Sequence, residues 1–481
     1  MHEFDVIVIG SGPGGQKAAI QAAKLGRTVA VIEKRRDVGG VQINTGTIPS
    51  KTLREAVIDL SGLRQRSVYG QSFRCDTDIT IQDLLVRAHH VMQVEQDVVR
   101  SQLGRNGVTL IGGTASFESP DTLVVDDGAG TERYRAKCVV IAVGTTPGMP
   151  PGLTVDHTTV LTSDDILKLE RLPRALTVVG AGIIGTEYAT IFAALGIEVT
   201  LLDRRTELLE MMDREIADAL VYQARNLGVT FRLGEEVARL ERHGDGRPVV
   251  VTNSGKRFVT DLVLVSAGRV GATAELALDR AGLAADARGR IAVNRFYQTS
   301  VPHVYAVGDV IGFPALAATS MEQGRLAVCH AFGVPAEAVP ELFPFGIYAI
   351  PEVAWVGKTE AELTSRGVPF ETGIARYREI ARGQILGDPD GMLKLLFHIE
   401  NRSILGVWCL GTQATELVHI GQAVMSLNGT LDYFVANVFN YPTLAECYKV
   451  AALDGYNKLR GLGAVPENPL PAATVVAPDA A

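Results

Sequence analysis

One motif occurs twice in this chain, and it restricts the possible folds more than any other feature of the sequence. Residues 6–9 are a β-branched run typical of a strand buried on both faces of a parallel sheet, and the pattern G-x-G-x-x-G follows directly. The first glycine permits a tight turn, the second lets backbone N–H groups approach a pyrophosphate, and the third lets the next helix pack on the strand. The residues of this first copy are Gly10, Gly12, Pro13, Gly14 and Gly15. The pattern predicts a β-α-β unit that holds dinucleotide phosphates at the N-terminus of its helix.

The second copy of the motif lies 170 positions further along the chain. Its residues are Gly180, Gly182, Ile183, Ile184 and Gly185. The acidic residue after the following strand keeps the same offset, because Glu33 corresponds to Asp203. A carboxylate at this position can accept a hydrogen bond from a ribose hydroxyl. Two such units predict two dinucleotides held face to face, and the chemistry that they share is hydride transfer between a flavin and a nicotinamide.

The composition is that of an ordinary globular protein and excludes several kinds of partner. At 481 residues the chain is too long for one hydrophobic core and suits about three domains. A formal net charge of −8 gives no basic field, so we expect no nucleic-acid partner. No apolar run approaches the roughly 20 residues of a membrane helix. The first strand begins too early to leave room for a signal peptide, so we expect a cytoplasmic protein.

The cysteines indicate free thiols rather than disulfides or metal ligands. The five are scattered, at Cys75, Cys138, Cys329, Cys409 and Cys447. Such spacing is typical of a protein from a reducing compartment. No C-x-x-C or H-E-x-x-H spacing occurs, and the adjacent His89 and His90 fall in a polar helical stretch that favours solvated surface. We therefore expect no metal site.

The order of the expected elements predicts an α/β fold in four segments. Breaker residues at 147–152 indicate one boundary near 150, and a second falls near 271. From about 340 the pattern changes to alternating strands and a helix. The expected segments are 1–150, 151–270, 271–340 and 341–462, with a disordered tail at 463–481.

Local patterns give more detailed expectations. Pro49 fits the first turn of a helix that follows a glycine-rich loop, with Ser50 or Thr47 as its cap. Other elements are expected as follows: a loop at 62–78, a helix at 81–105, strands at 108–115 and 122–125, a hairpin turn at 126–130, strands at 138–147, 262–269, 394–398 and 404–410, and a helix at 414–428.

In the order of its motifs the chain resembles the flavoprotein disulfide reductases. The shared motifs are the first glycine motif, a G-G loop that ends in G-T-I-P-S-K at 46–51, the second glycine motif and Y-A-V-G-D at 305–309. The resemblance spans about residues 4 to 460. It implies FAD on the first motif and Asp309, NAD(H) or NADP(H) on the second motif, and a C-terminal α+β domain that makes a homodimer or a higher homo-oligomer. The segments 1–150 and 271–340 would then bind FAD, and 151–270 the nicotinamide nucleotide.

Two departures from this family concern its redox disulfide. Gln42 and Thr47 occupy the positions of the two cysteines in the G-G loop, and neither side chain can form a disulfide or donate a thiolate to the flavin. The family's C-terminal H-P-T-x-x-E, whose histidine protonates the thiolate, reads Y-P-T-L-A-E from Tyr441. Without a thiolate to protonate, a histidine at this position would have no function in this chain.

One branch of the family lacks the disulfide and is similar to this chain in detail. It shares the stretches 46–51, 305–312, 346–352 and 440–446, although it commonly keeps the first of the two cysteines, from which Gln42 departs. The resemblance implies a Si-specific exchange of hydride, NADH + NADP⁺ = NAD⁺ + NADPH, by a ping-pong course through one nicotinamide site. Two other functions stay open: a flavin-dependent NAD(P)H dehydrogenase that reduces a quinone or dye, and a non-catalytic flavoprotein scaffold or redox sensor.

The resemblance also gives roles to individual residues. Lys51 would lie near flavin N5 and pair with Glu187, where an ammonium stabilises negative charge on the flavin; two unrelated surface charges are the alternative. Asp203 suits the 2′-hydroxyl of NAD, whereas Arg204 or Arg205 suits the 2′-phosphate of NADP, and together they predict use of both, although either arginine could be solvated. Further contacts with the cofactors are expected from Lys34, Gly39, Gly40, Gly46, Thr47, Gly113, Ala115, Gly144, Gly268 and Ala317.

Overall fold

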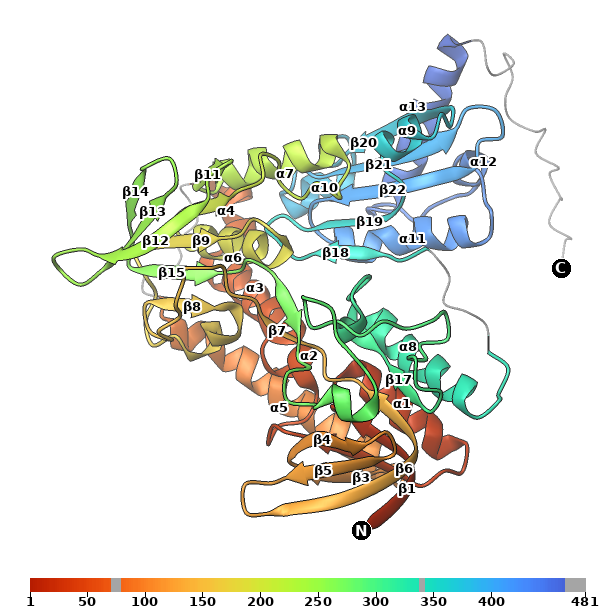
Figure 1. Ribbon diagram of the computed structural model, residues 1–481. Coiled ribbons are helices and arrows are strands. Elements are labelled where there is room, and N and C mark those ends of the chain that lie inside the picture. Colours follow the sequence, from red (N-terminus) through yellow and green to blue (C-terminus); the bar gives the residue numbers. More distant parts are fainter. Residues whose placement is uncertain (71–78, 337–341, 463–481) are drawn as a thin grey trace, which may run out of the picture.

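The first glycine motif opens a seven-stranded sheet in the computed structural model, which describes residues 1–70, 79–336 and 342–462 (Figure 1). Strands β1 (His2–Ile9) and β2 (Val29–Glu33) run parallel, and helix α1 (Pro13–Lys24) joins them. Both strands are buried over the run of β-branched residues, as the sequence predicts for a parallel sheet. This first sheet has the order β3-β2-β1-β6-β5-β4, with β17 beside β6. The remaining strands are β3 (Thr109–Gly112), β4 (Thr114–Ser119), β5 (Thr122–Asp126), β6 (Thr131–Ile141) and β17 (Val304–Ala306).

The second glycine motif opens a second, parallel sheet of similar build. Strand β9 (Ala175–Val179), helix α6 (Ile183–Ala194) and strand β10 (Glu198–Asp203) repeat the first β-α-β unit. The sheet order is β11-β10-β9-β15-β8, and a separate antiparallel meander, β12-β13-β14, packs against it. The other elements are β8 (Val160–Thr162), α7 (Arg214–Asn226), β11 (Val229–Leu233), β12 (Val237–Arg242), β13 (Pro248–Thr252), β14 (Arg257–Val259) and β15 (Leu262–Val265).

Two short strands connect the first and second sheets. Strand β7 (Thr145–Pro147) leaves the first sheet, and β16 (Arg269–Gly271) returns from the second, and they pair antiparallel. Both lie next to the domain boundaries expected near 150 and 271, which stay predictions.

The C-terminal part forms a third sheet, antiparallel and in the order β18-β19-β22-β21-β20, with helices packed against it (Figure 1). Its strands are β18 (Phe345–Ile347), β19 (Val353–Gly357), β20 (Phe370–Arg376), β21 (Met392–His398) and β22 (Ile404–Leu410). Its helices are α9 (Glu360–Ser365), α10 (Ala381–Leu386), α11 (Ala414–Ser426), α12 (Leu431–Ala436) and α13 (Glu446–Gly461). The three sheets and their helices confirm the predicted α/β fold with a C-terminal α+β part.

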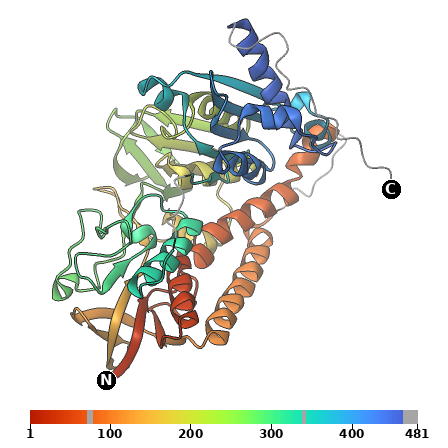
Figure 2. The same cartoon turned by 90° about the vertical axis from the view of Figure 1, so that its right-hand side faces the viewer.

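One helix next to the glycine-rich loop extends from the lower half of the molecule into the upper half (Figure 2). The loop contains the short helix α2 (Gly40–Asn44), and helix α3 (Thr47–Ser61) follows and packs beside α5 (Ile81–Arg105). Helix α8 (Ala317–Ala331) packs along α1. Helix α3 also contacts α6 of the second sheet, so it is the element that brings the two glycine motifs together.

Most local expectations are confirmed, but several are wrong, among them the strands expected at 138–147 and 262–269, which end at Ile141 and Val265. The helix at 81–105 and the strand at 404–410 have the predicted bounds, and a hairpin turn joins β5 to β6. The loop expected from residue 62 contains a helix, α4 (Leu63–Tyr69), and the rest of that loop from 71, like the tail at 463–481, lies outside the described residues. The strand expected at 108–115 divides at Gly113, because β3 pairs with β2 whereas β4 turns to pair with β5. Pro49 lies in the first turn of α3, but neither Thr47 nor Ser50 caps it; Gly46 is the N-cap residue and provides no side chain.

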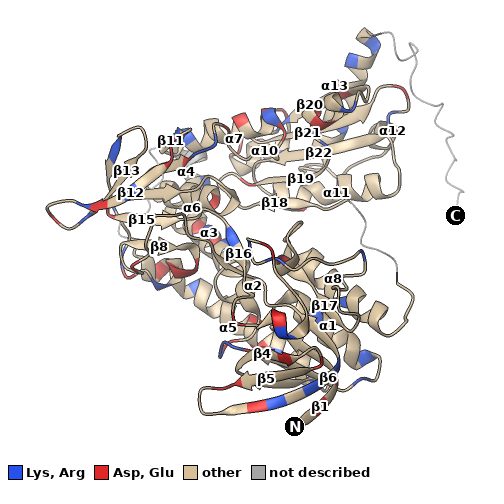
Figure 3. Cartoon of the chain, in the orientation of Figure 1, with Lys and Arg blue, Asp and Glu red and all other residues tan. Residues whose placement is uncertain are grey.

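Charged residues of both signs occur in all parts of the chain that Figure 3 colours. Figure 3 shows lysine and arginine interspersed with aspartate and glutamate along the chain. Within the described ranges, no helix combines the length and the apolar character that crossing a bilayer requires.

Candidate active site

The three glycines of the first motif have the separate structural roles predicted for them. Gly10 has φ +104°, and a Cβ there would lie 2.5 Å from the carbonyl oxygen of Ala142, so only glycine fits this turn. A Cβ on Gly15 would lie 2.0 Å from the carbonyl oxygen of Gly10, which explains the close packing of α1 on β1. A Cβ on Gly12, by contrast, would have no neighbour within 4 Å. The space before Gly12 is therefore open to a ligand.

A pocket begins at this open space and extends along the carboxyl ends of the first sheet. It is continuous with solvent, and its wall extends from the glycine turn after β1 to Asp309 after β17, a span that suits a dinucleotide. Thirteen residues assigned to the cofactor by the sequence line it: Gly10, Gly12, Pro13, Gly14, Glu33, Lys34, Gly40, Thr47, Gly113, Ala115, Gly144, Asp309 and Ala317. Four others, Gly15, Gly39, Gly46 and Lys51, do not line it. The open glycine turn, the length of the pocket and a carboxylate at each end fit FAD.

Glu33 is held in place by a residue that the sequence analysis missed. The N–H and the hydroxyl of Ser11 donate to Glu33 Oε2 over 2.9 and 2.6 Å, and the same hydroxyl accepts from the N–H of Gly39. Among the described residues, Glu33 Oε1 accepts one hydrogen bond, from the backbone N–H of Arg35 at 3.0 Å, so it can still accept from a ribose. A serine inside the glycine motif, 22 residues before an acidic strand end, was the available signal.

Asp309 lies at the other end of the pocket, after strand β17. It belongs to a short 3₁₀ segment, Gly308–Ile311, whose first N–H donates to Gln323 Oε1. Burial raises the pKa of Asp309, while the positive charge of Arg269 and a hydrogen bond with Thr145 oppose that rise. Arg269 also donates to Thr145 and pairs with Asp164 at 3.1 Å. Asp309, Thr145, Arg269 and Asp164 therefore connect the pocket to the paired strands β7 and β16, which link the two sheets.

Lys51 and Glu187 form the predicted ion pair, so the alternative of two unrelated surface charges is wrong. Lys51 Nζ lies 2.9 and 2.8 Å from the two carboxylate oxygens of Glu187. The Glu187 side chain is 4% exposed and that of Lys51 25%. Because Lys51 belongs to α3 and Glu187 to α6, the pair joins the two nucleotide-binding sheets.

A segment of the third sheet completes this junction, and the sequence analysis gave it no role. The backbone N–H of Tyr348 donates to Glu187 Oε1 over 2.8 Å, and its ring lies 4.9 Å from Lys51 Nζ, within cation–π range. The fully buried Arg54 donates to the carbonyl of Ala349 and pairs with Glu352. Three parts of the chain that are distant in sequence therefore hold the Lys51 ammonium in one position.

The loop next to this junction contains no sulfur. Gln42 and Thr47 both line the pocket. The described cysteines, Cys138, Cys329, Cys409 and Cys447, are free, as predicted, and all four are buried, whereas Cys75 lies outside the described residues. Burial raises the pKa of Cys138 and Cys447 to about 12, so these thiols stay protonated. The described part of the site offers no thiolate.

The second glycine motif has the same geometry as the first. A Cβ on Gly185 would lie 1.9 Å from the carbonyl oxygen of Gly180, and a Cβ on Gly182 would again meet no neighbour. Gly182 is the N-cap residue of α6, which Ile183 and Ile184 begin, and Gly268 lies just before β16. This arrangement provides a second helix N-terminus for a pyrophosphate.

The acidic residue of the second motif differs from Glu33 in its surroundings. Asp203 is buried, and the guanidinium of Arg205 pairs with it at 2.7 Å. Burial alone would raise the pKa of Asp203, but hydrogen bonds from Arg205 and Ala181 hold it below its usual value. Arg204 is exposed and makes no hydrogen bond or ion pair with the described residues. The expected acceptor and cations are thus all present, but one cation already contacts the acceptor.

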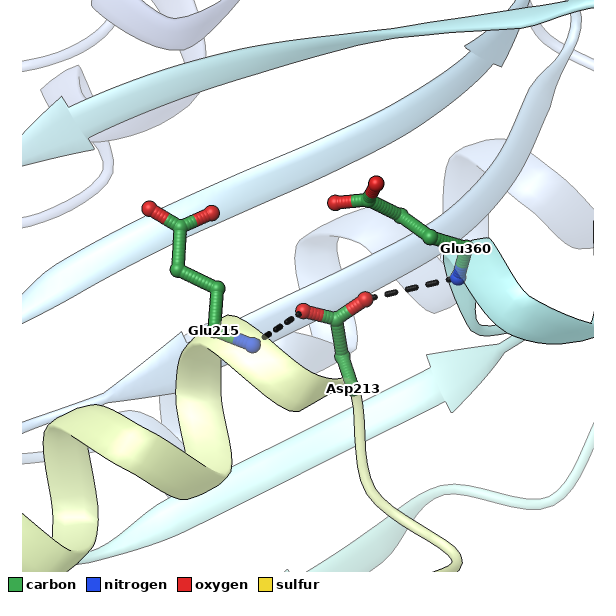
Figure 4. Close-up of side chains that lie close together, drawn as sticks. All are labelled: Asp213, Glu215 and Glu360. Carbon is green, nitrogen blue, oxygen red and sulfur yellow. Dashed lines mark hydrogen bonds between the residues drawn. The ribbon is translucent and has the colours of Figure 1, made fainter.

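One cluster of carboxylates outside these sites has a geometry that could suit a cation. Figure 4 shows Asp213, Glu215 and Glu360 close together, with the Asp213 carboxylate accepting backbone N–H groups of the other two. The fully buried ammonium of Lys394 already lies 2.8 Å from Asp213 and 3.1 Å from Glu215, and also contacts Glu360. Burial alone would lower the pKa of Lys394, but these carboxylates raise it. The cluster is an ion-pair network between α7, α9 and β21.

Comparisons with known proteins agree with this arrangement. Residues 4–324 match the family model described as pyridine nucleotide-disulphide oxidoreductase, and residues 343–452 match the model for the dimerisation domain of that family. A soluble pyridine nucleotide transhydrogenase from Mycobacterium tuberculosis is 55% identical over 96% of this chain and 99% of its own length. Another, from Colwellia psychrerythraea, is 44% identical over 95% of this chain and 99% of its own length.

Solved structures show the same fold. The HOCl-induced flavoprotein disulfide reductase RclA from Escherichia coli, as a Cu(II) complex, matches with a TM-score of 0.86 at 26% identity, over 94% of this chain and 99% of that protein. LpdA from Mycobacterium tuberculosis matches with a TM-score of 0.86 at 24% identity, over 94% and 99% of the two chains.

Proposed function

The chain belongs to the pyridine nucleotide-disulphide oxidoreductase family, and on that basis we propose that it is an FAD-dependent transhydrogenase that catalyses NADH + NADP⁺ = NAD⁺ + NADPH. One observation carries this proposal. Gln42 and Thr47, both in the wall of the FAD pocket, occupy the positions where the resemblance implies the family's redox cysteines. Without a disulfide to reduce, a second nicotinamide nucleotide is the natural acceptor. Relatives of nearly full length at 44–55% identity, each named a soluble pyridine nucleotide transhydrogenase, support the same reaction.

FAD, when bound in the pocket of the first sheet, supplies a two-electron carrier between the two nucleotides. Glu33 and Asp309 would accept hydrogen bonds from its ribose and its sugar-like chain, and the amides near Gly12 would meet its pyrophosphate. The Lys51 ammonium brings a positive charge to the junction of the two sheets, where it stabilises negative charge that develops during hydride transfer. Glu187 and the Tyr348 N–H fix its position. A single nicotinamide site at the second motif implies that one nucleotide leaves before the other binds.

The third sheet supports a homodimer. It coincides with the family's dimerisation domain, and its helices and loops carry several large apolar side chains that are exposed in the single chain. These are Leu427, Tyr433, Val438, Tyr441 and Leu453, of which Val438 is 93% exposed. A second copy of the chain on this surface would bury them. We place the enzyme in the cytoplasm, because NAD(H) and NADP(H) are its proposed substrates.

An exchange assay with purified, FAD-loaded protein tests the function. NADPH is mixed with the thio analogue of NAD⁺, whose reduced form absorbs separately, and the assay is repeated with a quinone as the acceptor. We expect rapid formation of thio-NADH and slower reduction of the quinone. Reduction of the quinone without thio-NADH would instead identify an NAD(P)H dehydrogenase, and the absence of both would favour a scaffold or sensor.

A further inference from the structure

The internal repeat allows the two nucleotide sites of this chain to be compared position by position. The residue two places after the acidic strand end is an arginine in both, Arg35 in the first motif and Arg205 in the second. Both donate their backbone N–H to the carboxylate before them, over 3.0 Å to Glu33 and 2.8 Å to Asp203. Only the second arginine also turns its side chain onto that carboxylate. The difference concerns the side chains and not the backbone.

With this contact, all hydrogen-bond acceptor positions of the Asp203 carboxylate are occupied. Its Oδ1 accepts Arg205 Nε at 3.0 Å in addition to the backbone N–H, and its Oδ2 accepts Arg205 Nη2 and the Ala181 N–H, both at 2.7 Å. Each carboxylate oxygen offers about two lone-pair sites, so all four are occupied. The Asp203 side chain is 7% exposed and that of Arg205 34%, so their pairing cancels a buried negative charge where the adenosine ribose is expected.

The residue between the carboxylate and the arginine also differs between the two motifs, but here it is the first motif whose side chain is paired. In the first motif the equivalent residue is Lys34, which pairs with Glu275 at 2.9 Å. In the second motif it is Arg204, which is exposed and has no hydrogen-bond or ion-pair partner in the described ranges. The second site therefore combines a carboxylate that is paired with one guanidinium and a second guanidinium without a partner, whereas in the first site, among the described residues, the carboxylate has no cationic side chain as a partner and the neighbouring ammonium is already paired. If Arg204 and Arg205 both bound the phosphate in the same way, we would not expect one of them to be paired with Asp203 and the other to have no partner.

We propose that Arg204 and Arg205 have different tasks in choosing the nucleotide, an inference that rests on the proposed function. Arg204 is the residue that binds the 2′-phosphate of NADP(H). Arg205 is a positioning residue that neutralises Asp203, so that the phosphate does not meet an uncompensated carboxylate. NAD(H) is accepted by the same site because its 2′-hydroxyl can replace one Arg205 N–H as the donor to Asp203. Use of both NAD(H) and NADP(H) thus depends on Asp203 remaining a carboxylate, able to accept from the 2′-hydroxyl, while Arg205 compensates its negative charge.

Binding of adenosine 2′,5′-bisphosphate and of 5′-AMP to the FAD-loaded protein, measured by calorimetry, tests this division without hydride transfer. Arg204→Ala should weaken the bisphosphate about 10- to 100-fold, the loss of a charge-assisted contact, and change 5′-AMP by less than about threefold. Arg205→Ala should also weaken the bisphosphate. Adding Asp203→Asn should restore the bisphosphate in the Arg205→Ala protein, because an amide needs no neutralising cation, but not in the Arg204→Ala protein.

The outcomes separate the possibilities. Failure of Asp203→Asn to rescue Arg205→Ala would mean that Arg205 itself binds the phosphate, and normal binding by Arg204→Ala would mean that Arg204 is solvated; either result overturns the proposal. Arg239→Ala, which removes an exposed charge paired with Glu241 from the same part of the chain, is the matched control and should not change binding. Retained FAD and circular dichroism confirm folding. A parent protein that binds the bisphosphate but transfers no hydride would contradict the proposed function alone.

Discussion

Replacement of Lys51 by methionine should slow hydride transfer strongly and weaken nucleotide binding little. Opposite unit charges about 4 Å apart attract by about 4 kcal/mol at the effective dielectric constant of a protein near its surface. The Lys51 side chain is 25% exposed and paired with Glu187, so a smaller share of this energy reaches the transition state. We expect a loss of about 1.5–3 kcal/mol, or about 10- to 150-fold in the rate of hydride transfer.

The same change has a second effect that must be separated from the first. It leaves the buried Glu187 carboxylate, among the described residues, with the Tyr348 N–H as its one remaining partner, and an unpaired buried charge costs about 3 kcal/mol of folding stability or more. Adding Glu187→Gln removes that charge. The double variant should therefore regain most of the lost stability in a denaturant titration while its rate stays low.

Stopped-flow mixing of each variant with NADH or NADPH, followed through the flavin absorbance, measures the rate, and its dependence on concentration gives the binding constant. A rate that recovers together with stability in the double variant would show that Lys51 acts only through folding. If Lys51→Met alone transferred hydride as fast as the parent protein, the proposed position of the Lys51 charge beside the reacting groups would be refuted.

Three further predictions concern other parts of the molecule. The purified protein should be yellow with FAD and show no long-wavelength thiolate charge-transfer band on reduction, because Gln42 and Thr47 replace the thiols; such a band in the visible spectrum would contradict this. Hydrogen bonds from the backbone N–H groups of residues 158–160 hold the pKa of Asp156 below its usual 3.8 even though burial opposes them, so its stabilising effect is full above that value and is lost as the pH falls through the lowered pKa. Asp156→Asn should thus lower the midpoint of urea unfolding at pH 7, and the difference from the parent should shrink in acid; a constant difference would count against it. Lys394→Met should lower the free energy of unfolding, measured in the same titration, by about 3–5 kcal/mol, because it leaves Asp213 buried without its cation. Equal stability of the two proteins would show that the ion-pair network does not stabilise the fold.

The sequence was most informative where local rules decide the structure. The helix at 81–105 follows from its apolar spacing, and the Thr80–Asp83 capping box fixes its start. The positive φ of Gly10 and the contact of Gly15 with Gly10 are likewise local, whereas the close approach of Gly10 to Ala142 depends on the neighbouring strand. The long-range ion pair of Lys51 with Glu187 came instead from the family resemblance, because 136 positions separate the two residues and no spacing rule connects them.

The rest depended on contacts that have no local signal. Tyr348 contributes to the junction through a backbone N–H, which every residue except proline has, to a carboxylate 161 positions away. The sequence offered Arg204 and Arg205 as equivalent cations, because the rotamer of each is set by its surroundings and not by its position. The division of the strand at Gly113 similarly depends on which neighbour each half pairs with.

The absence of sulfur from the pocket wall has a consequence for life under oxidative stress. Hypochlorous acid, peroxides and electrophiles attack proteins first at accessible thiolates, and enzymes that relay electrons through a cysteine pair stop when that pair is oxidised or alkylated. Gln42 and Thr47 offer such reagents no target, the cysteines in the described ranges are buried, and burial raises the pKa of Cys138 and Cys447 to about 12. Under oxidant attack, the proposed exchange would therefore depend on the supply of nicotinamide nucleotides and not on the redox state of a cysteine pair.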